Sequence, residues 1–153
     1  QEVPCFVLLW FAAHLPEITG GAGNGILRDL YMRLAFPGRF FDQRFILLKD
    51  SEGIQGFAAF GPRADDPGIF KLHKIYVLPR NHGKGYGRTL IDEVKKRCVS
   101  EGIQTLDLNV NRFNPAKGFY ERLGFSVIRE EDVPAGPYFM NDYVMRLEMA
   151  DKV

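Results

Sequence analysis

The most constraining feature of the sequence is a set of three alternate glycines, Gly83, Gly85 and Gly87, between an apolar segment and an amphipathic one. The residues before them, Lys71 to Val77, are rich in apolar, aromatic and β-branched side chains and predict a strand that ends before Pro79. The residues after them predict a helix, because apolar side chains recur there at helical spacing. That apolar face consists of Leu90, Ile91, Val94 and Cys98.

A glycine loop that leads into a helix can bind an anion, because its backbone N–H groups are not screened by a Cβ atom. The first turn of the helix adds free donors and a partial positive charge. Lys84 and Arg88 add full positive charges. A plain strand-to-helix turn would explain one glycine, whereas three alternate glycines with two cations favour a site for phosphate or pyrophosphate.

Two common phosphate motifs do not fit this loop. A Walker A loop needs a first glycine where this chain has Leu78, and it needs Ser or Thr after Gly-Lys, where this chain has Gly85. The dinucleotide fingerprint needs the spacing G-x-G-x-x-G early in a βαβ unit, whereas this loop reads G-x-G-x-G in the middle of the chain.

Residues 82–87, HGKGYG, resemble the acyl-CoA-binding motif of the GNAT superfamily of N-acyltransferases, Gln/Arg-x-x-Gly-x-Gly/Ala. His82 replaces the leading Gln or Arg, which weakens one pyrophosphate contact but leaves the backbone contacts unaffected. A second block, residues 114–125 (NPAKGFYERLGF), resembles the family pattern N-x-P-A-x-x-F-Y-x-x-x-G-F. Asn114 and Gly124 are typical residues before and after a short helix.

The resemblance implies one α/β (α+β) domain over residues 1–153, with a mixed, mostly antiparallel sheet flanked by helices. The sheet should splay between its fourth and fifth strands, predicted at Lys71–Val77 and Thr105–Val110, which should be parallel neighbours. The other predicted strands are Phe45–Lys49, Ile54–Phe60, Phe125–Glu130 and Tyr138–Met149.

The N-terminal part resembles the family least. Pro4–Leu15 has the length of a helix, Gly20–Gly25 predicts a flexible loop, and Ile26–Ala35 predicts an amphipathic helix. The family usually begins with a strand, and this region offers no clear candidate for it. The chain begins with Gln1, which leaves open whether the N-terminus is trimmed, and we expect no signal peptide.

Composition narrows the class of protein. A net charge of +1 argues against a nucleic-acid binder. Cys5 and Cys98 belong to no Cys/His cluster, so we expect no metal site, and a buried free thiol in the cytoplasm is the simpler interpretation of Cys98. The apolar segment near the N-terminus is too short to cross a membrane. The sequence does not determine the oligomeric state, and a homodimer is one option.

The cofactor that the resemblance implies is acetyl-CoA. Its pantetheine arm would pair with the strand backbone at Ile75, Tyr76 and Val77, and the Val77 amide would polarise the thioester carbonyl. Asn114 and Lys117 are further candidate contacts. The pyrophosphate would lie on His82, Gly83, Lys84, Gly85, Tyr86, Gly87 and Arg88.

Tyr120 matches the family tyrosine that protonates the leaving thiolate, although it could also serve only in packing. Its ordinary pKa of about 10 is close to the thiol value of about 8.5, so proton transfer is nearly balanced. The predicted strand holds no carboxylate to act as base, and His73 is the candidate there. A structural role for His73, with proton transfer through water or a neutral amine, is the alternative.

Two functions remain open from the sequence. The first is an N-acetyltransferase that acts on a small amine, a polyamine or a protein amine. The second is a non-catalytic module that binds acyl-CoA as a sensor or partner domain. Tyr120 and the complete glycine loop favour the enzyme, and neither motif identifies the acceptor amine.

Overall fold

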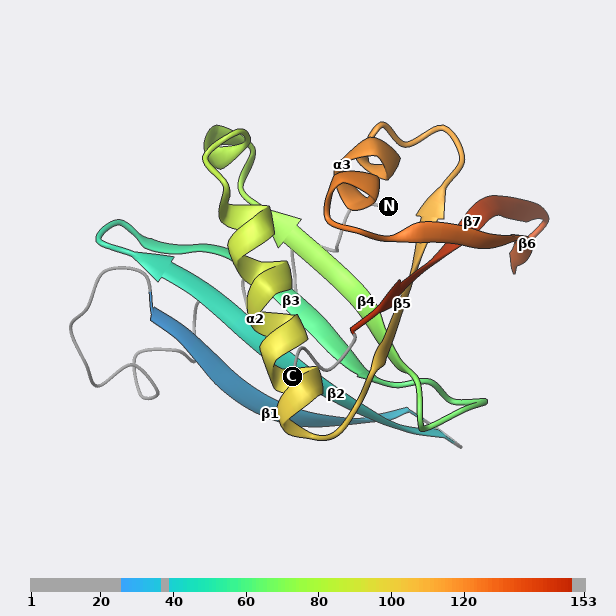
Figure 1. Ribbon diagram of the computed structural model, residues 1–153, viewed down its shortest axis with the longest axis horizontal. Coiled ribbons are helices and arrows are strands. Elements are labelled where there is room, and N and C mark those ends of the chain that lie inside the picture. The colour runs from blue at the N-terminus through green and yellow to red at the C-terminus, as the bar shows by residue number, and fades with distance from the viewer. Residues whose placement is uncertain (1–25, 37–38, 150–153) are drawn as a thin grey trace.

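The computed structural model describes the backbone of residues 26–36 and 39–149 and the side chains of residues 43–149. One seven-stranded sheet runs through this part in the order β1-β2-β3-β4-β5-β7-β6 (Figure 1). Its strands are β1 (Ile26–Phe36), β2 (Arg39–Asp50), β3 (Gly53–Pro62), β4 (Phe70–Val77), β5 (Thr105–Asn111), β6 (Ser126–Ala135) and β7 (Tyr138–Glu148). The helices are the 3₁₀ turn η2 (Pro79–Asn81), α2 (Tyr86–Ser100) and α3 (Ala116–Arg122).

The segment predicted as a helix over Ile26–Ala35 is a strand, and that prediction was wrong. It pairs with β2 in an antiparallel ladder from Ile26 opposite Lys49 to Phe36 opposite Arg39. A helical spacing of a few leucines is a weak signal over so short a segment, and tertiary strand pairing overrides it. The predictions for Pro4–Leu15 and Gly20–Gly25 concern residues outside the described ones.

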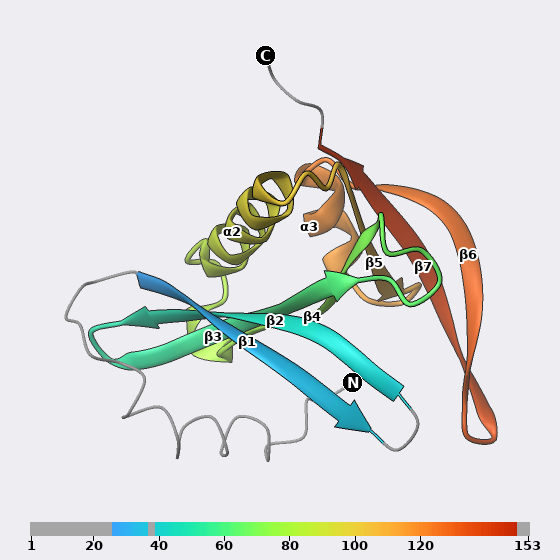
Figure 2. The same ribbon diagram turned by 90° about the horizontal axis from the view of Figure 1, so that it is seen from below.

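Both α2 and α3 cover one face of the sheet (Figure 2). The apolar face predicted for α2 is confirmed, because its four residues, Leu90, Ile91, Val94 and Cys98, are completely buried. They belong to a cluster that includes Ile46, Phe60 and Leu72 from the sheet. Cys98 is a free thiol, and burial, followed by the nearby Glu101, raises its pKa to about 12.

The predicted splay between β4 and β5 has a clear origin in the strand pairing. The two strands are parallel neighbours, but only Phe70 to Leu72 pair with β5, opposite Leu106 to Leu108. Beyond Leu72, β4 continues to Val77 without a partner strand on that side among residues 26–36 and 39–149, and the ribbons of β4 and β5 diverge (Figure 1). The sheet therefore offers free backbone groups along the second half of β4.

The last two strands form a longer hairpin than the sequence indicates. The predicted strands Phe125–Glu130 and Tyr138–Met149 are separated by a shorter connection than the prediction implies, since β6 reaches Ala135 and β7 begins at Tyr138. Among the residues that the structure describes, no helix is long and apolar enough to cross a membrane.

Candidate active site

The glycine loop presents a row of backbone donors in front of α2. Gly83 and Gly85 have φ angles of +83° and +81°, in the left-handed region that glycine tolerates best. Within the described residues, the N–H groups of Gly83 and Gly85 and the first three amides of α2 have no hydrogen-bond partner. A Cβ atom built on either glycine meets nothing within 4 Å, so the space in front of these donors is open. This arrangement suits a phosphate or pyrophosphate group.

A buried polar network holds the loop against the β2–β3 turn. Gln55 is completely buried and Asn81 is nearly so, and the Asn81 amide donates to Gln55 Oε1. Gln55 Nε2 donates to Asp50 Oδ1 at 2.9 Å, and the Tyr86 hydroxyl donates to Asp50 Oδ2 at 3.1 Å. Lys84 Nζ donates to Asn81 Oδ1 at 3.1 Å. The network therefore fixes both ends of the glycine loop.

The open edge of β4 continues from this loop. The Leu78 amide donates to the Gln55 carbonyl on β3. Because such bonds alternate along an antiparallel pair, the backbone groups of Tyr76 face β3, whereas those of Ile75 and Val77 face the gap beside β5. The Tyr76 ring lies 6.2 Å from the Phe57 ring.

The His82 side chain lies beside Val77, at the end of the open edge of β4. Its Nε2 atom lies 3.1 Å from the Val77 carbonyl oxygen, so the imidazole is directed toward β4. The Val77 amide stays available to a ligand carbonyl.

Tyr120 lies on α3, on the helix side of the gap. Its ring is almost completely buried between Phe119, at 5.3 Å, and Phe125, at 6.0 Å. Its hydroxyl has no hydrogen-bond partner among the described residues, and burial raises the pKa of the phenol. The phenol is therefore protonated at neutral pH and can donate its proton.

The first turns of α2 and α3 are in close contact. A Cβ atom on Gly87 would lie 3.3 Å from the Phe119 ring, so this glycine allows the two helices to approach. The amides of the loop and Tyr120 thus belong to one continuous region.

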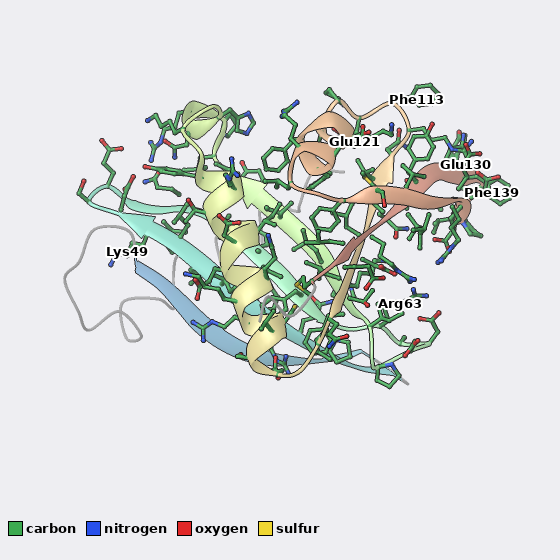
Figure 3. The ribbon with its side chains drawn as sticks, in the orientation of Figure 1. Lys49, Arg63, Phe113, Glu121, Glu130 and Phe139 are labelled. Atoms are coloured by element: carbon green, nitrogen blue, oxygen red, sulfur yellow. The ribbon has the colours of Figure 1, made fainter. Side chains whose placement is uncertain are left out.

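Asn114 and Lys117 have structural partners of their own. Asn114 Oδ1 accepts a hydrogen bond from the Ala116 amide at 2.9 Å, as expected for a helix cap. Lys117 pairs with Glu121, which Figure 3 labels on α3, and its ammonium lies 5.4 Å from the centre of the Tyr143 ring. Arg88, by contrast, is exposed on the first turn of α2.

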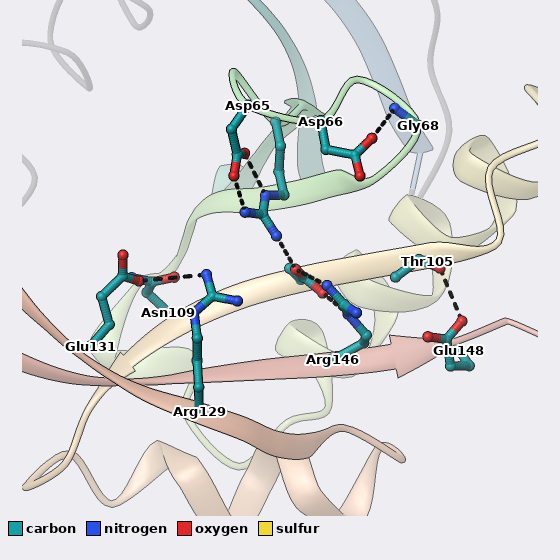
Figure 4. A network of polar contacts seen from close by, with 11 residues as sticks. Asp65, Asp66, Gly68, Thr105, Asn109, Arg129, Glu131, Arg146 and Glu148 are labelled. Atoms are coloured by element: carbon teal, nitrogen blue, oxygen red, sulfur yellow. Dashed lines mark hydrogen bonds and ion pairs between the residues drawn. The ribbon is translucent and has the colours of Figure 1, made fainter.

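A cavity of about 400 Å³ opens at the point where β4 and β5 separate. Its walls come from the β3–β4 loop and from β4, β5, β6 and β7 (Figure 4). Asp107 and Asn109 line it, and they alternate along β5 with Leu106 and Leu108, which pack on the helix side. The cavity therefore lies on the sheet face opposite the helices.

His73 is part of this cavity. Burial, followed by the nearby charges of Lys71 and Lys74, lowers the pKa of His73 to about 4. The imidazole is therefore uncharged at neutral pH, and it can accept a proton only weakly.

This pKa predicts a pH-dependent loss of stability. Below its ordinary pKa of about 6.5, the unfolded chain protonates His73 while the folded chain does not, so acid favours unfolding until about pH 4. When the pH falls from about 7 to about 4.5, the free energy of unfolding of the wild type should therefore decrease. In His73→Gln this decrease should be smaller by about 2 kcal/mol. Urea denaturation of both proteins at the two pH values measures the difference, and equal losses would contradict the shifted pKa.

The structure brings the glycine loop, the open edge of β4 and Tyr120 together, and it places His73 on the other side of the same gap. The sequence alone did not indicate a role for Gln55 and Asn81, or for the charged residues around the cavity. Asp107 and Asn109 could have been noticed, because they form the polar side of an alternating strand.

Comparisons with known proteins agree with this arrangement. Residues 41–127 match the model of the acetyltransferase (GNAT) domain. The chain belongs to the GNAT family of acetyltransferases. It is 34% identical over 109 residues to an uncharacterized N-acetyltransferase of Mycobacterium tuberculosis, and the match covers 70% of this chain and 69% of that protein.

This acetyltransferase is also similar to a [ribosomal protein bS18]-alanine N-acetyltransferase of Haemophilus influenzae, at 32% identity over 56% of this chain and 58% of the relative. Among solved structures, it resembles the PaiA N-acetyltransferase of Thermoplasma acidophilum in complex with coenzyme A, with a TM-score of 0.57 and 28% identity. That match covers 71% of this chain and 62% of the other. The resemblance seen in the sequence motifs is thereby confirmed at the level of family and fold.

Proposed function

We propose that this acetyltransferase transfers the acetyl group of acetyl-CoA to a primary amine by direct attack. The observation that carries the proposal is a set of amides without a partner among the described residues, those of Gly83, Gly85 and the first three residues of α2, which continues into the free edge of β4. A pyrophosphate followed by an extended pantetheine arm matches this sequence of donors. That a structural neighbour is in complex with coenzyme A supports the choice of cofactor.

The pantetheine amides would pair with the backbone of Ile75 and Val77, as an added strand does. The thioester would then lie in the gap between β4 and β5, where the amides of Ile75 and Val77 face and either one can donate to its carbonyl oxygen. The Ile75 amide is the closer of the two to His73, two residues away along β4. A fixed donor at this position stabilises the negative charge that develops on that oxygen.

In the reaction, the lone pair of the amine nitrogen attacks the thioester carbonyl carbon. A C–N bond forms, the C–S bond breaks, and the sulfur leaves with the electron pair as the thiolate of CoA. Tyr120 gives its phenolic proton to this thiolate. The proton lost by the amine passes to His73 or to water, and solvent returns a proton to Tyr120.

His73 has the correct protonation state for this role but little basicity, because its pKa is about 4. An efficient general base has a pKa closer to the working pH. We therefore assign to His73 a relay of the proton to solvent, and expect the amine to enter the site in its neutral form.

The alternative is a module that binds acyl-CoA without turnover. Release of free thiol from acetyl-CoA separates the two, using small primary amines, spermidine and a peptide with an N-terminal alanine as acceptors. The proposal predicts thiol release that depends on one of these amines, with an equal amount of acetylated amine detected by mass spectrometry. Binding of CoA without thiol release above the amine-free rate would favour the module.

A further inference from the structure

The cavity beside His73 is lined by charged residues, and the pairing of these charges determines which acceptor can occupy it. Cations and carboxylates contribute equally to the lining, with Arg63, Lys71 and Arg129 against Asp65, Asp107 and Glu131. A volume of about 400 Å³ is in the range of small-molecule sites. The question is therefore which of these charges remain available to a ligand.

The carboxylates are already paired. Asp107 is only 1% exposed and accepts hydrogen bonds from Arg63 Nη1 at 2.8 Å and from Arg146 Nε at 2.8 Å (Figure 4). Arg63 also donates from Nε to Asp65 at 2.9 Å. Such charge-assisted pairs are short and directional, and breaking one inside a buried cluster is costly. The buried Asp107 is therefore not available to a second ammonium group of an acceptor. The side chain of Asp65 is 69% exposed, but both Nε and Nη2 of Arg63 donate to it, and this bidentate pair neutralises its charge.

Glu131 is the remaining carboxylate of the lining. It lies 3.9 Å from Arg129, and Asn109 Nδ2 donates to it at 3.4 Å, so it too has partners. A long, half-exposed pair of this kind is weak, but its two charges are opposite, so it adds no net charge that would favour an anion or an ammonium group.

The remaining unpaired charge is positive. The half-buried side chain of Lys71 lines the cavity and forms neither an ion pair nor a hydrogen bond with any residue that the structure describes. Lys74, nearby on the same strand, is exposed and does not line the cavity. A partly desolvated ammonium without a counterion attracts an anion more strongly than an exposed one does.

We infer that the cavity is the acceptor site and that it selects a small amine that also carries an anionic group, a carboxylate or a phosphate. The inference rests on the proposed function. The anion lies beside Lys71, while the amine lies at the start of the gap near His73. Two residues along a strand span about 7 Å, so a few bonds separate the two groups of the acceptor. Polyamines are disfavoured, because their second ammonium would meet Lys71 rather than an unpaired carboxylate.

The test compares amines that differ only in the anionic group. Glycine, β-alanine and phenylalanine are each paired with the corresponding carboxamide, and phosphoethanolamine is compared with diaminopropane. For the wild type, we expect kcat/KM to be about tenfold or more higher for the anionic member of at least one pair, a difference of about 1.4 kcal/mol. Phosphoethanolamine distinguishes a phosphate site from a carboxylate site.

Lys71→Met should reduce that ratio to about one, while Lys74→Met, which also removes one positive charge near His73, should leave it unchanged. A wild-type preference for the carboxamides or for diaminopropane would overturn the inference, and so would an unchanged ratio in Lys71→Met.

The same amines are also titrated calorimetrically in the presence of CoA, so that affinity is measured independently of turnover. Tighter binding of the anionic members without any thiol release would contradict the proposed function while supporting the anion site. Thiol release without a preference for the anionic amines would support the proposed function and contradict the anion site.

Discussion

Tyr120→Phe should lower kcat by about 10²–10⁴, the usual contribution of a positioned general acid, and leave the affinity for acetyl-CoA unchanged. The ring of Tyr120 packs between Phe119 and Phe125, and phenylalanine preserves that packing. The hydroxyl has no partner among the described residues, so its removal breaks no hydrogen bond that the structure records there. Steady-state kinetics on the best acceptor, together with CoA titration and a thermal melt, measure the three quantities.

A matched control is Tyr138→Phe. Tyr138 is 76% exposed at the start of β7, so this change also removes one phenolic oxygen but does so in solvent. It should leave kcat unchanged. If Tyr120→Phe also kept its full kcat, Tyr120 would serve only in packing, and the thiolate would leave without its help.

The second large effect is expected at the glycine loop. Gly85→Val should weaken CoA binding by at least about 100-fold, because the valine side chain enters the open space in front of the loop amides. Loss of two charge-assisted hydrogen bonds, at about 1.5–3 kcal/mol each, accounts for an effect of this size. Isothermal titration calorimetry with CoA measures it directly.

Backbone strain is separated from obstruction by Gly102→Val. Gly102 has a φ of +76° and equally open space at its Cβ position, but it follows the other end of α2. Both variants should therefore lose stability by a similar amount, about 1–3 kcal/mol, while only Gly85→Val loses the ligand. Equal CoA affinity in the two variants would mean that the pyrophosphate binds elsewhere.

The local structure around the glycine loop could be predicted from the sequence, because it depends mainly on neighbouring residues. The strand before the loop, the start of the helix after it and the apolar face of that helix each depend on a few neighbouring residues, and all three lie as expected. The parallel pairing of β4 with β5 and their separation beyond it were also predicted, through the family resemblance.

The cavity that we propose as the acceptor site could not be predicted in the same way. The cavity joins residues from five separate segments of the chain, and the pairing of Asp107 with Arg63 and Arg146 crosses 44 and 39 residues. Such pairs can be recognised only once the order of the strands in the sheet is known. The wrong prediction of a helix over Ile26–Ala35 also arose from a long-range contact. Pairing with β2, rather than the spacing of the segment's own apolar residues, decides its conformation.

A crystal structure with CoA bound would test the proposed site most directly. We expect the pyrophosphate on the loop amides between Gly83 and Arg88, the pantetheine beside Ile75 and Val77, and the sulfur in the gap between β4 and β5 within reach of the Tyr120 hydroxyl. Density for CoA on another surface, with these amides left without a ligand, would contradict the proposed site.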